Sequence, residues 1–201
     1  TAIGKMMGSL SGINPADMAA KVIRNILEET KLDPSVIDEV IVGNILMAGQ
    51  KQGIARQASV KAGIPHHVPA YSVNMICGSG MKSIMNGCNS ILAGQASVVL
   101  AGGVEIMSAS GFVMQGIREG LKMGDFKAVD HMVCDGLTDA FGNYHMGVTA
   151  ENIAERYNIT REQQDAFSFQ SQQKAIRAID AGKFRDEIVP VEIVSKKETL
   201  V

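Results

Sequence analysis

The fold of this chain is decided at a junction between a predicted strand and a predicted helix, in the stretch Asn74-Met75-Ile76-Cys77-Gly78-Ser79-Gly80. Residues 70–75 have the character of a strand, and apolar residues at helical spacing over 79–92 predict a helix. Gly94 ends this helix, and residues 97–101 again have the character of a strand. A strand, a helix and a second strand in succession predict parallel pairing through a right-handed crossover.

The same alternation extends toward the N-terminus. Asn14-Pro15 is a strong helix start, since Asn caps helices and Pro is favoured at their first position. Residues 39–46 predict a buried strand, and residues 54–62 predict a helix that Gly63 closes. We therefore predict an α/β fold over residues 1–107, with a mostly parallel sheet covered by helices on both faces.

The pattern changes after this core. Residues 108–147 are rich in glycine and have little periodicity, which predicts a loop-rich insertion too long to be an idle connection. Two helices are then predicted, one beginning near Thr149 and one opening with the capping box Thr160-Arg161-Glu162-Gln163. A strand is predicted over 188–194. We expect residues 108–201 to form a second domain, made of the insertion and these helices.

Composition excludes several classes of function. The 19 Lys and Arg nearly balance 21 Asp and Glu, and aromatic residues make up only 4%, so nothing indicates a nucleic-acid partner. The apolar runs fall short of the roughly 20 residues that a membrane span needs. Three cysteines are too few for a disulfide framework, so we expect a cytoplasmic protein, with a mature organelle enzyme as the alternative. Both ends look cut, so we expect part of a longer protein.

Cys77 is the candidate nucleophile. Its position after a strand places it at the carboxyl end of the sheet, where open α/β folds bind ligands. The N-terminus of the following helix would favour a thiolate, and its N–H groups can hold an oxyanion. Gly78 and Gly80 permit positive φ and a close substrate approach. A cysteine that is simply buried in a glycine-rich turn is the other interpretation, and the residues alone leave both open.

Four separated motifs resemble the thiolases. They are the stretch at 74–80, Ala-Gly-Gly-Val-Glu-Ile-Met-Ser at 101–108, Asp-Gly-Leu-Thr-Asp-Ala-Phe at 135–141 and Tyr-His-Met-Gly-Val-Thr-Ala-Glu-Asn at 144–152. The resemblance covers nearly the whole chain, and it is closest to the acetyl-CoA acetyltransferase (acetoacetyl-CoA thiolase) branch of the family.

This resemblance implies half of a layered αβαβα fold and an acyltransferase that works through an acyl-Cys77 intermediate. The reaction would be the reversible Claisen condensation of two acetyl-CoA to acetoacetyl-CoA and CoA, or thiolysis of a 3-ketoacyl-CoA. Leu137, His145 and Met146 match positions that contact coenzyme A. No metal or cofactor is implied beyond the coenzyme A thioesters. Thiolases are dimers or tetramers, and residues 108–147 resemble the segment through which tetrameric members associate.

The family's remaining catalytic residues are not matched. They belong to a Gly-His-Pro motif and a Cys-x-Gly-Gly motif in a C-terminal half, and neither motif occurs in these 201 residues. We therefore expect the chain to be inactive by itself.

Other functional interpretations of the sequence remain open. A ketoacyl-ACP synthase-like condensing enzyme shares the strand, cysteine and helix junction, and a non-catalytic thiolase-like module would keep the fold alone. A cysteine hydrolase is less well supported, since no His with Asn or Asp is indicated. Among single residues we expect Cys88 to be core, Cys134 to have no metal partners, and His66 and His67 to be exposed. His131 has no assigned role.

Overall fold

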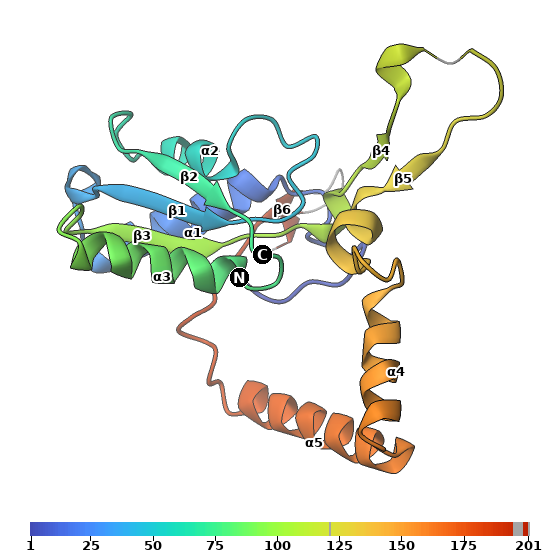
Figure 1. Ribbon diagram of the computed structural model, residues 1–201. Coiled ribbons are helices and arrows are strands. Elements are labelled where there is room, and N and C mark those ends of the chain that lie inside the picture. The colour runs from blue at the N-terminus through green and yellow to red at the C-terminus, as the bar shows by residue number, and fades with distance from the viewer. Residues whose placement is uncertain (121, 195–198, 201) are drawn as a thin grey trace. The chain divides into compact units, whose positions relative to one another are not determined.

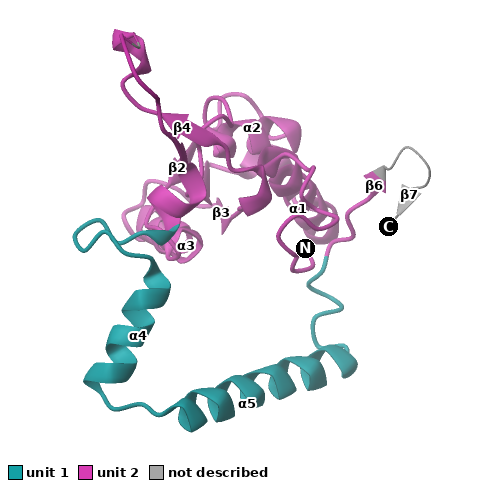
Figure 2. Ribbon diagram, turned by 90° about the vertical axis from the view of Figure 1, so that its right-hand side faces the viewer, with its two compact units in different colours: residues 1, 137–188 teal, residues 2–136, 189–201 magenta. Residues whose placement is uncertain are grey.

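The computed structural model describes residues 1–120, 122–194 and 199–200. These fall into two compact units, which Figure 2 shows in different colours. The larger unit contains residues 2–136 and 189–201, and the smaller contains residue 1 and residues 137–188. The predicted domains over residues 1–107 and 108–201 are defined by their functions, so this division stays a prediction.

The larger unit is built on a parallel sheet of three strands in the order β2-β1-β3 (Figure 1). Helices cover both of its faces, so the predicted α/β class is confirmed. The elements are α1 (Pro15–Thr30), β1 (Glu39–Gly43), α2 (Ile54–Lys61), β2 (Ala70–Val73), α3 (Ser79–Leu92) and β3 (Val99–Gly103).

The face of the sheet under α1 and α2 holds the main hydrophobic core. Side chains alternate between the faces of a strand, and Val40 and Val42 of β1 are directed to this side. Pro15 begins α1, and the Asn14 side chain accepts a hydrogen bond from the Ala16 N–H (2.9 Å), as the sequence predicts. The buried cluster consists of Ala20, Ile23, Leu27, Ile37, Val40, Val42, Ala55, Ala58, Ala62, Ile64 and Val68.

The other face of the sheet carries α3, on the opposite side from α1 and α2 (Figure 2). This helix meets the sheet through small residues. A side chain on Gly87 would place its Cβ 2.9 Å from Val99 Cγ1, and the buried Ser83 hydroxyl donates to the Gly102 carbonyl (2.7 Å). The outward side of α3 is apolar and exposed. Cys88 is exposed on this helix, so the expectation that it is core is wrong.

Two strand boundaries differ from the sequence prediction because side chains capture backbone N–H groups. β1 ends at Gly43 rather than 46, since the Ile45 N–H donates to Glu105 Oε2 (2.8 Å). β3 begins at Val99 rather than 97, since the Ser97 N–H donates to Asp38 Oδ2 (2.7 Å). Both acceptors are far away in the sequence, so local patterns do not reveal them.

The predicted loop-rich insertion contains an antiparallel hairpin. Its strands are β4 (Phe112–Met114) and β5 (Ala128–Asp130), and a short 3-10 turn lies at Ile117–Glu119. A π-helical segment follows at Met132–Leu137. Of the strand predicted over 188–194, only β6 (Ile193–Val194) forms, and it pairs with β7 (Thr199–Leu200).

The smaller unit consists of a loop and two helices, α4 (Met146–Arg156) and α5 (Arg161–Asp180). The Thr160 capping box is confirmed, with both of its hydrogen bonds to Gln163 present. α4 begins three residues before the predicted Thr149, because His145 caps it. Within the described ranges, none of the helices is long and apolar enough to cross a membrane.

Candidate active site

The candidate nucleophile Cys77 lies in a tight turn between β2 and α3, and it is exposed. The turn is closed by its own backbone. The Gly78 N–H donates to the Met75 carbonyl (3.1 Å), and the Ser79 N–H donates to the Ile76 carbonyl (3.0 Å). The Asn74 side chain accepts a hydrogen bond from the Ile76 N–H (3.0 Å). These bonds fix the five residues between strand and helix.

The buried side chain of Ser79 stabilises the same turn through hydrogen bonds. This residue is only 4% exposed, and its hydroxyl has two partners on the chain that leads to Cys77. Its Oγ accepts a hydrogen bond from the Met75 N–H (2.8 Å) and donates to the Ile76 carbonyl (2.6 Å). Cys77 is therefore presented by a turn that is hydrogen-bonded both along its backbone and through a buried side chain.

The strained residue of the turn is Ile76, which has a φ of 49°. Positive φ is rare for β-branched residues, and such strain persists only where surrounding contacts enforce it. The glycines at 78 and 80 permit positive φ, but neither adopts it. Gly78 has a φ of −83°, and Gly80 is not among the residues with positive φ.

The two glycines differ in the space around them. A Cβ on Gly78 would lie 2.6 Å from the terminal carbon of the Met75 side chain. Gly80 lies on the side of α3 that meets β3, where a side chain would contact the backbone of Gly103 (3.8 Å). A side chain would therefore crowd Met75 at Gly78, whereas at Gly80 it would make only ordinary contact.

Glu105 organises the carboxyl edge of the sheet beside this turn. Its carboxylate accepts hydrogen bonds from the Ile45 N–H (2.8 Å), the Leu46 N–H (3.2 Å) and the Asn44 side chain (3.1 Å). The Asn44 amide also donates to the Val104 carbonyl (3.0 Å). The segment after β1 is thus tied to the end of β3. Glu105 belongs to the motif at 101–108, and the sequence alone indicates no role for it.

His131, to which the sequence assigns no role, is buried and paired. Its Nδ1 lies 2.6 Å from Asp135 Oδ2, and its Nε2 lies 3.5 Å from the Ala48 N–H. A His and an Asp four residues apart on a helical segment share one face, and this spacing could have revealed the pair. His66 and His67 are exposed, as expected.

The three predicted coenzyme-contacting residues lie together in one short loop of the smaller unit. Thr138 and His145 form an antiparallel bridge, so Leu137 is brought close to His145 and Met146. The Asp139 N–H donates to the Tyr144 carbonyl (2.9 Å) and closes the loop. His145 Nδ1 accepts a hydrogen bond from the Gly147 N–H (3.0 Å) and so caps α4.

Cys77, Gly78 and Gly80 form the corresponding group in the larger unit. The structure therefore assembles the predicted site residues as two local groups, each ordered by its own hydrogen bonds.

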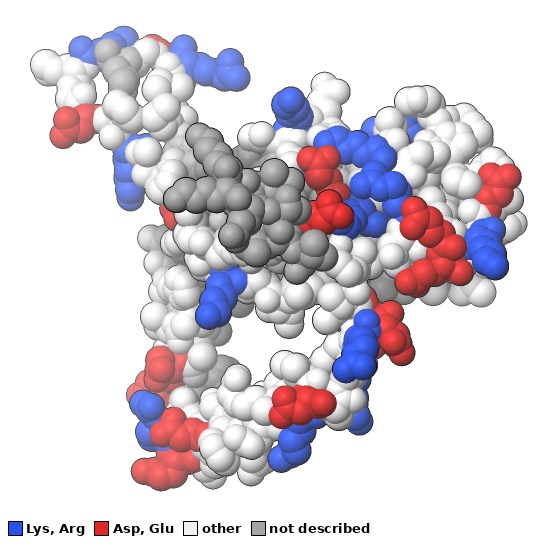
Figure 3. Space-filling model, turned by 180° about the vertical axis from the view of Figure 1, so that it is seen from behind, with Lys and Arg blue, Asp and Glu red and all other residues white. Residues whose placement is uncertain are grey.

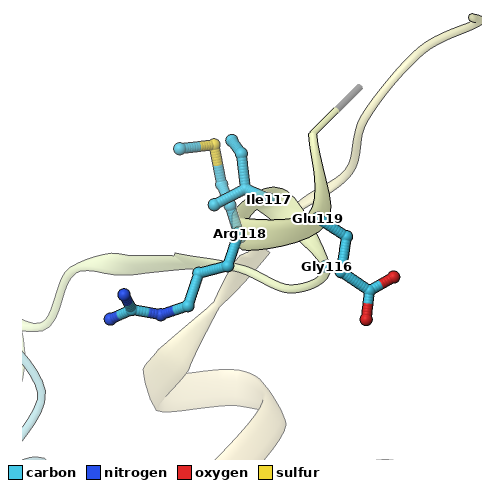
Figure 4. A pocket seen from close by; sticks show the side chains of 5 residues that line it. Gly116, Ile117, Arg118 and Glu119 are labelled. Carbon is cyan, nitrogen blue, oxygen red and sulfur yellow. The ribbon is translucent and has the colours of Figure 1, made fainter. Parts of the chain in front are cut away.

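A separate hollow lies at the tip of the hairpin between β4 and β5. Its lining comes from one short stretch, namely Met114, Gly116, Ile117, Arg118 and Glu119. Figure 4 shows the Arg118 and Glu119 side chains pointing away from one another. No pair of functional groups converges there, so this hollow does not compete with the Cys77 turn as a candidate site.

Neither the charges on the face shown in Figure 3 nor the potential metal ligands among the described residues indicate a further site. On the face shown in Figure 3, Lys and Arg are interspersed with Asp and Glu. Among the described residues, no group of three His, Cys, Asp or Glu is arranged to hold a metal. The adjacent Asp135 raises the pKa of the Cys134 thiol through a hydrogen bond, which disfavours the thiolate at that cysteine.

Comparison with known proteins agrees with this geometry. The family described as "Thiolase, N-terminal domain" matches residues 1–201. An "Acetyl-CoA acetyltransferase" of Pseudomonas aeruginosa is 54% identical over 197 residues, which cover 98% of this chain and 50% of the relative. A "Probable acetyl-CoA acyltransferase" of Staphylococcus aureus is 52% identical, and an "Acetyl-CoA acetyltransferase" of Allochromatium vinosum is 50% identical, with the same coverage.

The chain spans about half the length of these relatives. None of the three carries the name of a ketoacyl-ACP synthase, so the comparison does not favour that alternative. The match extends from the first residue to the last and includes the turn that presents Cys77. This chain therefore belongs to the thiolase family, as a thiolase N-terminal domain.

Proposed function

We propose that the protein containing this chain is an acyltransferase that condenses two acetyl-CoA molecules to acetoacetyl-CoA and CoA, and runs the reverse thiolysis. The single observation that carries the proposal is the exposed Cys77 on a strained, hydrogen-bonded turn at the N-terminus of α3. Its membership of the thiolase family and the names of its relatives supply the substrate class.

The first step is a thioester exchange at Cys77. The Sγ thiolate attacks the carbonyl carbon of acetyl-CoA and forms a carbon–sulfur bond. The bond from that carbon to the sulfur of coenzyme A breaks, and coenzyme A leaves and takes up a proton. One thioester replaces another, so the step costs little free energy. Splitting the reaction in this way is what covalent catalysis provides.

The second step forms the carbon–carbon bond. The α-carbon of a second acetyl-CoA loses a proton and attacks the carbonyl carbon of acetyl-Cys77. The bond from that carbon to Cys77 Sγ breaks, the thiolate is regenerated, and acetoacetyl-CoA is the product. In the first step an acceptor takes the proton of the Cys77 thiol and passes it to the departing coenzyme A, and in the second step an acceptor takes the proton of the α-carbon. The resemblance assigns these acceptors to two motifs that do not occur in the 201 residues, so we expect them elsewhere in the protein.

The oxyanion of each step needs hydrogen-bond donors near Cys77. The Gly78 N–H is already used within the turn, since it donates to the Met75 carbonyl (3.1 Å). Gly80 lies in the first turn of α3, and no acceptor for its N–H is found among the described residues. We therefore assign the donor role to Gly80 and a role in shaping the turn to Gly78.

Coenzyme A is proposed to contact Leu137, His145 and Met146. The exposed side chains of His145 and Met146 support this role, because they stand at the start of α4 and remain available to a ligand. The hydrogen bond from the Gly147 N–H to His145 Nδ1 fixes the orientation of the ring. The proposed reaction uses only coenzyme A thioesters and no metal or other cofactor.

The partner and location proposals follow the resemblance. We propose a homo-oligomer, a dimer or a homotetramer that associates through the hairpin insertion, in the cytoplasm and without nucleic-acid or membrane partners. Large apolar side chains on the insertion support self-association, since Phe112, Met123 and Phe126 are 69%, 98% and 54% exposed. The domain roles are a nucleophile-bearing core over 1–107 and a coenzyme-binding and association region over 108–201.

Acetylation of the intact protein tests this function. The protein is incubated with acetyl-CoA, quenched in acid, digested and analysed by mass spectrometry. We expect one acetyl group on the peptide that contains Cys77, and none on Cys88 or Cys134. Added coenzyme A should remove the label, because the exchange is reversible. A protein that forms no acetyl-Cys77 and makes no acetoacetyl-CoA does not have the proposed function.

A further inference from the structure

Gly43 is the last residue of the central strand β1, and it lies directly beneath the first turn of α3. The register pairs it with Val73 on one side and Gly103 on the other. A Cβ on Gly43 would lie 2.4 Å from the Ser79 carbonyl carbon and 2.5 Å from the Gly80 nitrogen. Real Cβ atoms essentially never approach so closely, and both atoms belong to the backbone, so neither can swing aside.

The requirement for glycine at this position is one of space. Gly43 is not among the glycines with positive φ, so an alanine could adopt its backbone conformation. What a methyl group cannot do is share the volume that the Ser79–Gly80 peptide occupies. Restoring ordinary contact, which begins at 3.4 Å, needs a separation of about 1 Å between β1 and the start of α3.

A displacement of Ser79 cannot leave Cys77 in place. Ser79 is bound to the turn through its N–H and its hydroxyl, with partners at Met75 and Ile76. These bonds make residues 75–79 one rigid turn, and Cys77 lies in its middle. Lifting the first turn of α3 therefore moves the Cys77 thiol and the nearby helix N-terminus together.

We propose that Gly43 is a positioning residue for Cys77. Its missing side chain sets the depth at which the first turn of α3 lies on β1, and so fixes the placement of the nucleophile. The proposal rests on the proposed function only for the identity of Cys77 as the nucleophile. A misplacement of about 1 Å at a reacting group is expected to lower the rate by as much as ~10²-fold.

Two glycines of β3 provide a graded comparison. A Cβ on Gly103 would lie 3.1 Å from the Gly80 Cα, a contact that a shift of a few tenths of an ångström relieves. A Cβ on Gly102 would meet nothing within 4 Å. Gly43→Ala, Gly103→Ala and Gly102→Ala therefore add the same methyl group with strong, weak and no interference at α3.

The experiment compares these three variants in the full-length protein that contains the chain. Acetylation of Cys77 by acetyl-CoA is followed by peptide mass spectrometry across a range of pH, and iodoacetamide alkylation of Cys77, Cys88 and Cys134 measures the accessibility of each thiol. Thermal unfolding is measured alongside. We expect the Cys77 acetylation rate to fall about 10- to 100-fold in Gly43→Ala and by a smaller factor in Gly103→Ala, because the thiol is displaced from the groups that position the thioester. Its alkylation rate should change little, because the thiol and the helix N-terminus move together. Gly102→Ala should retain the wild-type rate, and the pH profile should shift only in the other two.

A purely structural role predicts a different result. In that case Gly43→Ala lowers the midpoint of thermal unfolding while Cys77 keeps its wild-type acetylation rate and pH profile in the folded protein, and the proposal is overturned. If Gly43→Ala does not fold, the test rests on Gly103→Ala. An unchanged acetylation rate and pH profile of Cys77 in that variant also overturns the proposal. Failure of the proposed function is distinct, because wild-type Cys77 would then be alkylated but never acetylated by acetyl-CoA.

Discussion

The two faces of the parallel sheet are built on different principles. Under α1 and α2, interlocking apolar side chains are buried, as Ile23 of α1 and Val40 of β1 illustrate. Under α3, glycine and serine bring backbone against backbone, as at Gly43 and Ser83. The first arrangement gains stability from buried apolar area. The second buries little apolar area, but it sets the distance between the sheet and α3, which begins two residues after Cys77.

This contrast predicts which property a substitution on each face should change. A change on the α1 and α2 face should alter the free energy of unfolding with little effect on chemistry. A change at the start of α3 should alter chemistry first.

The largest expected effect is on the α3 side. Cys77→Ser should lower acyl transfer by about 10³-fold or more, because it removes the proposed nucleophile and residues that act as a catalytic unit lose nearly all activity when one is removed. Thermal unfolding should be unchanged, since Cys77 is exposed. Acetoacetyl-CoA formation and calorimetry are the measurements. Cys134→Ser is the control and should retain activity, and activity surviving in Cys77→Ser would break the comparison.

The next effect belongs to the opposite face. Ile23→Ala should lower the free energy of unfolding by about 2–5 kcal/mol, the usual cost of truncating a buried isoleucine. Ile23 is 4% exposed, whereas Ile26 on the same helix is 42% exposed. Ile26→Ala should therefore cost less than about 1 kcal/mol in denaturant unfolding. Equal costs at the two positions would contradict the assignment of the core to this face.

A pair of buried serines sharpens the contrast. Both are fully buried, but Ser83 donates to the Gly102 carbonyl (2.7 Å), while the Ser59 hydroxyl has no partner among the described residues. Ser83→Ala should cost about 0.5–1.5 kcal/mol, since it removes a hydrogen bond that joins α3 to β3. Ser59→Ala should be neutral or stabilising in the same urea titration. The opposite order would show that polar anchoring does not hold α3.

The smallest effect concerns the entry to β3. Hydrogen bonds from the Val98 N–H (3.0 Å) and the Ser97 N–H (2.7 Å) lower the pKa of Asp38 below its ordinary 3.8. A carboxyl whose folded pKa is depressed stabilises the fold above its unfolded pKa, and the contribution is lost as the pH falls through the folded value.

Asp38→Asn should therefore lower the midpoint of thermal unfolding slightly at neutral pH. The difference from wild type should shrink as the pH falls below about 3.8. Asp125→Asn, at an exposed position in the insertion, is the control and should behave as wild type at every pH. If the difference in unfolding midpoint between Asp38→Asn and wild type grew as the pH fell, the stabilising role of the Asp38 carboxylate would be contradicted.

Features encoded within a few residues were predictable from the sequence. Asn14-Pro15 and the Thr160 capping box mark helix starts with side chains that act on their own turn, and both are confirmed. The succession of strands and helices likewise predicted the parallel sheet and the position of Cys77 at its edge.

What the sequence did not predict depends on distant partners. The positive φ falls on Ile76 and not on a glycine, because Ser79 and Asn74 hold the turn in place. Cys88 has the spacing of a core residue, but the sheet side of α3 is taken by small residues that permit closer approach. The burial of His131 depends on the segment around Ala48, about 80 residues earlier in the chain. The catalytic role of Cys77 and the coenzyme A contacts of Leu137, His145 and Met146 stay predictions.

The hydrogen bonds of Glu105 have a consequence for the order in which the chain is made. The segment after β1 emerges from the ribosome with its N–H groups unpaired, and their acceptor is 60 residues downstream. At roughly 5–20 residues per second, synthesis of those residues takes about 3–12 s. During that interval β1, α2 and β2 have been synthesised, but the hydrogen bonds to Glu105 that fix the end of β1 cannot form. The site edge is therefore completed during translation only after β3 and the residues beyond it have been made.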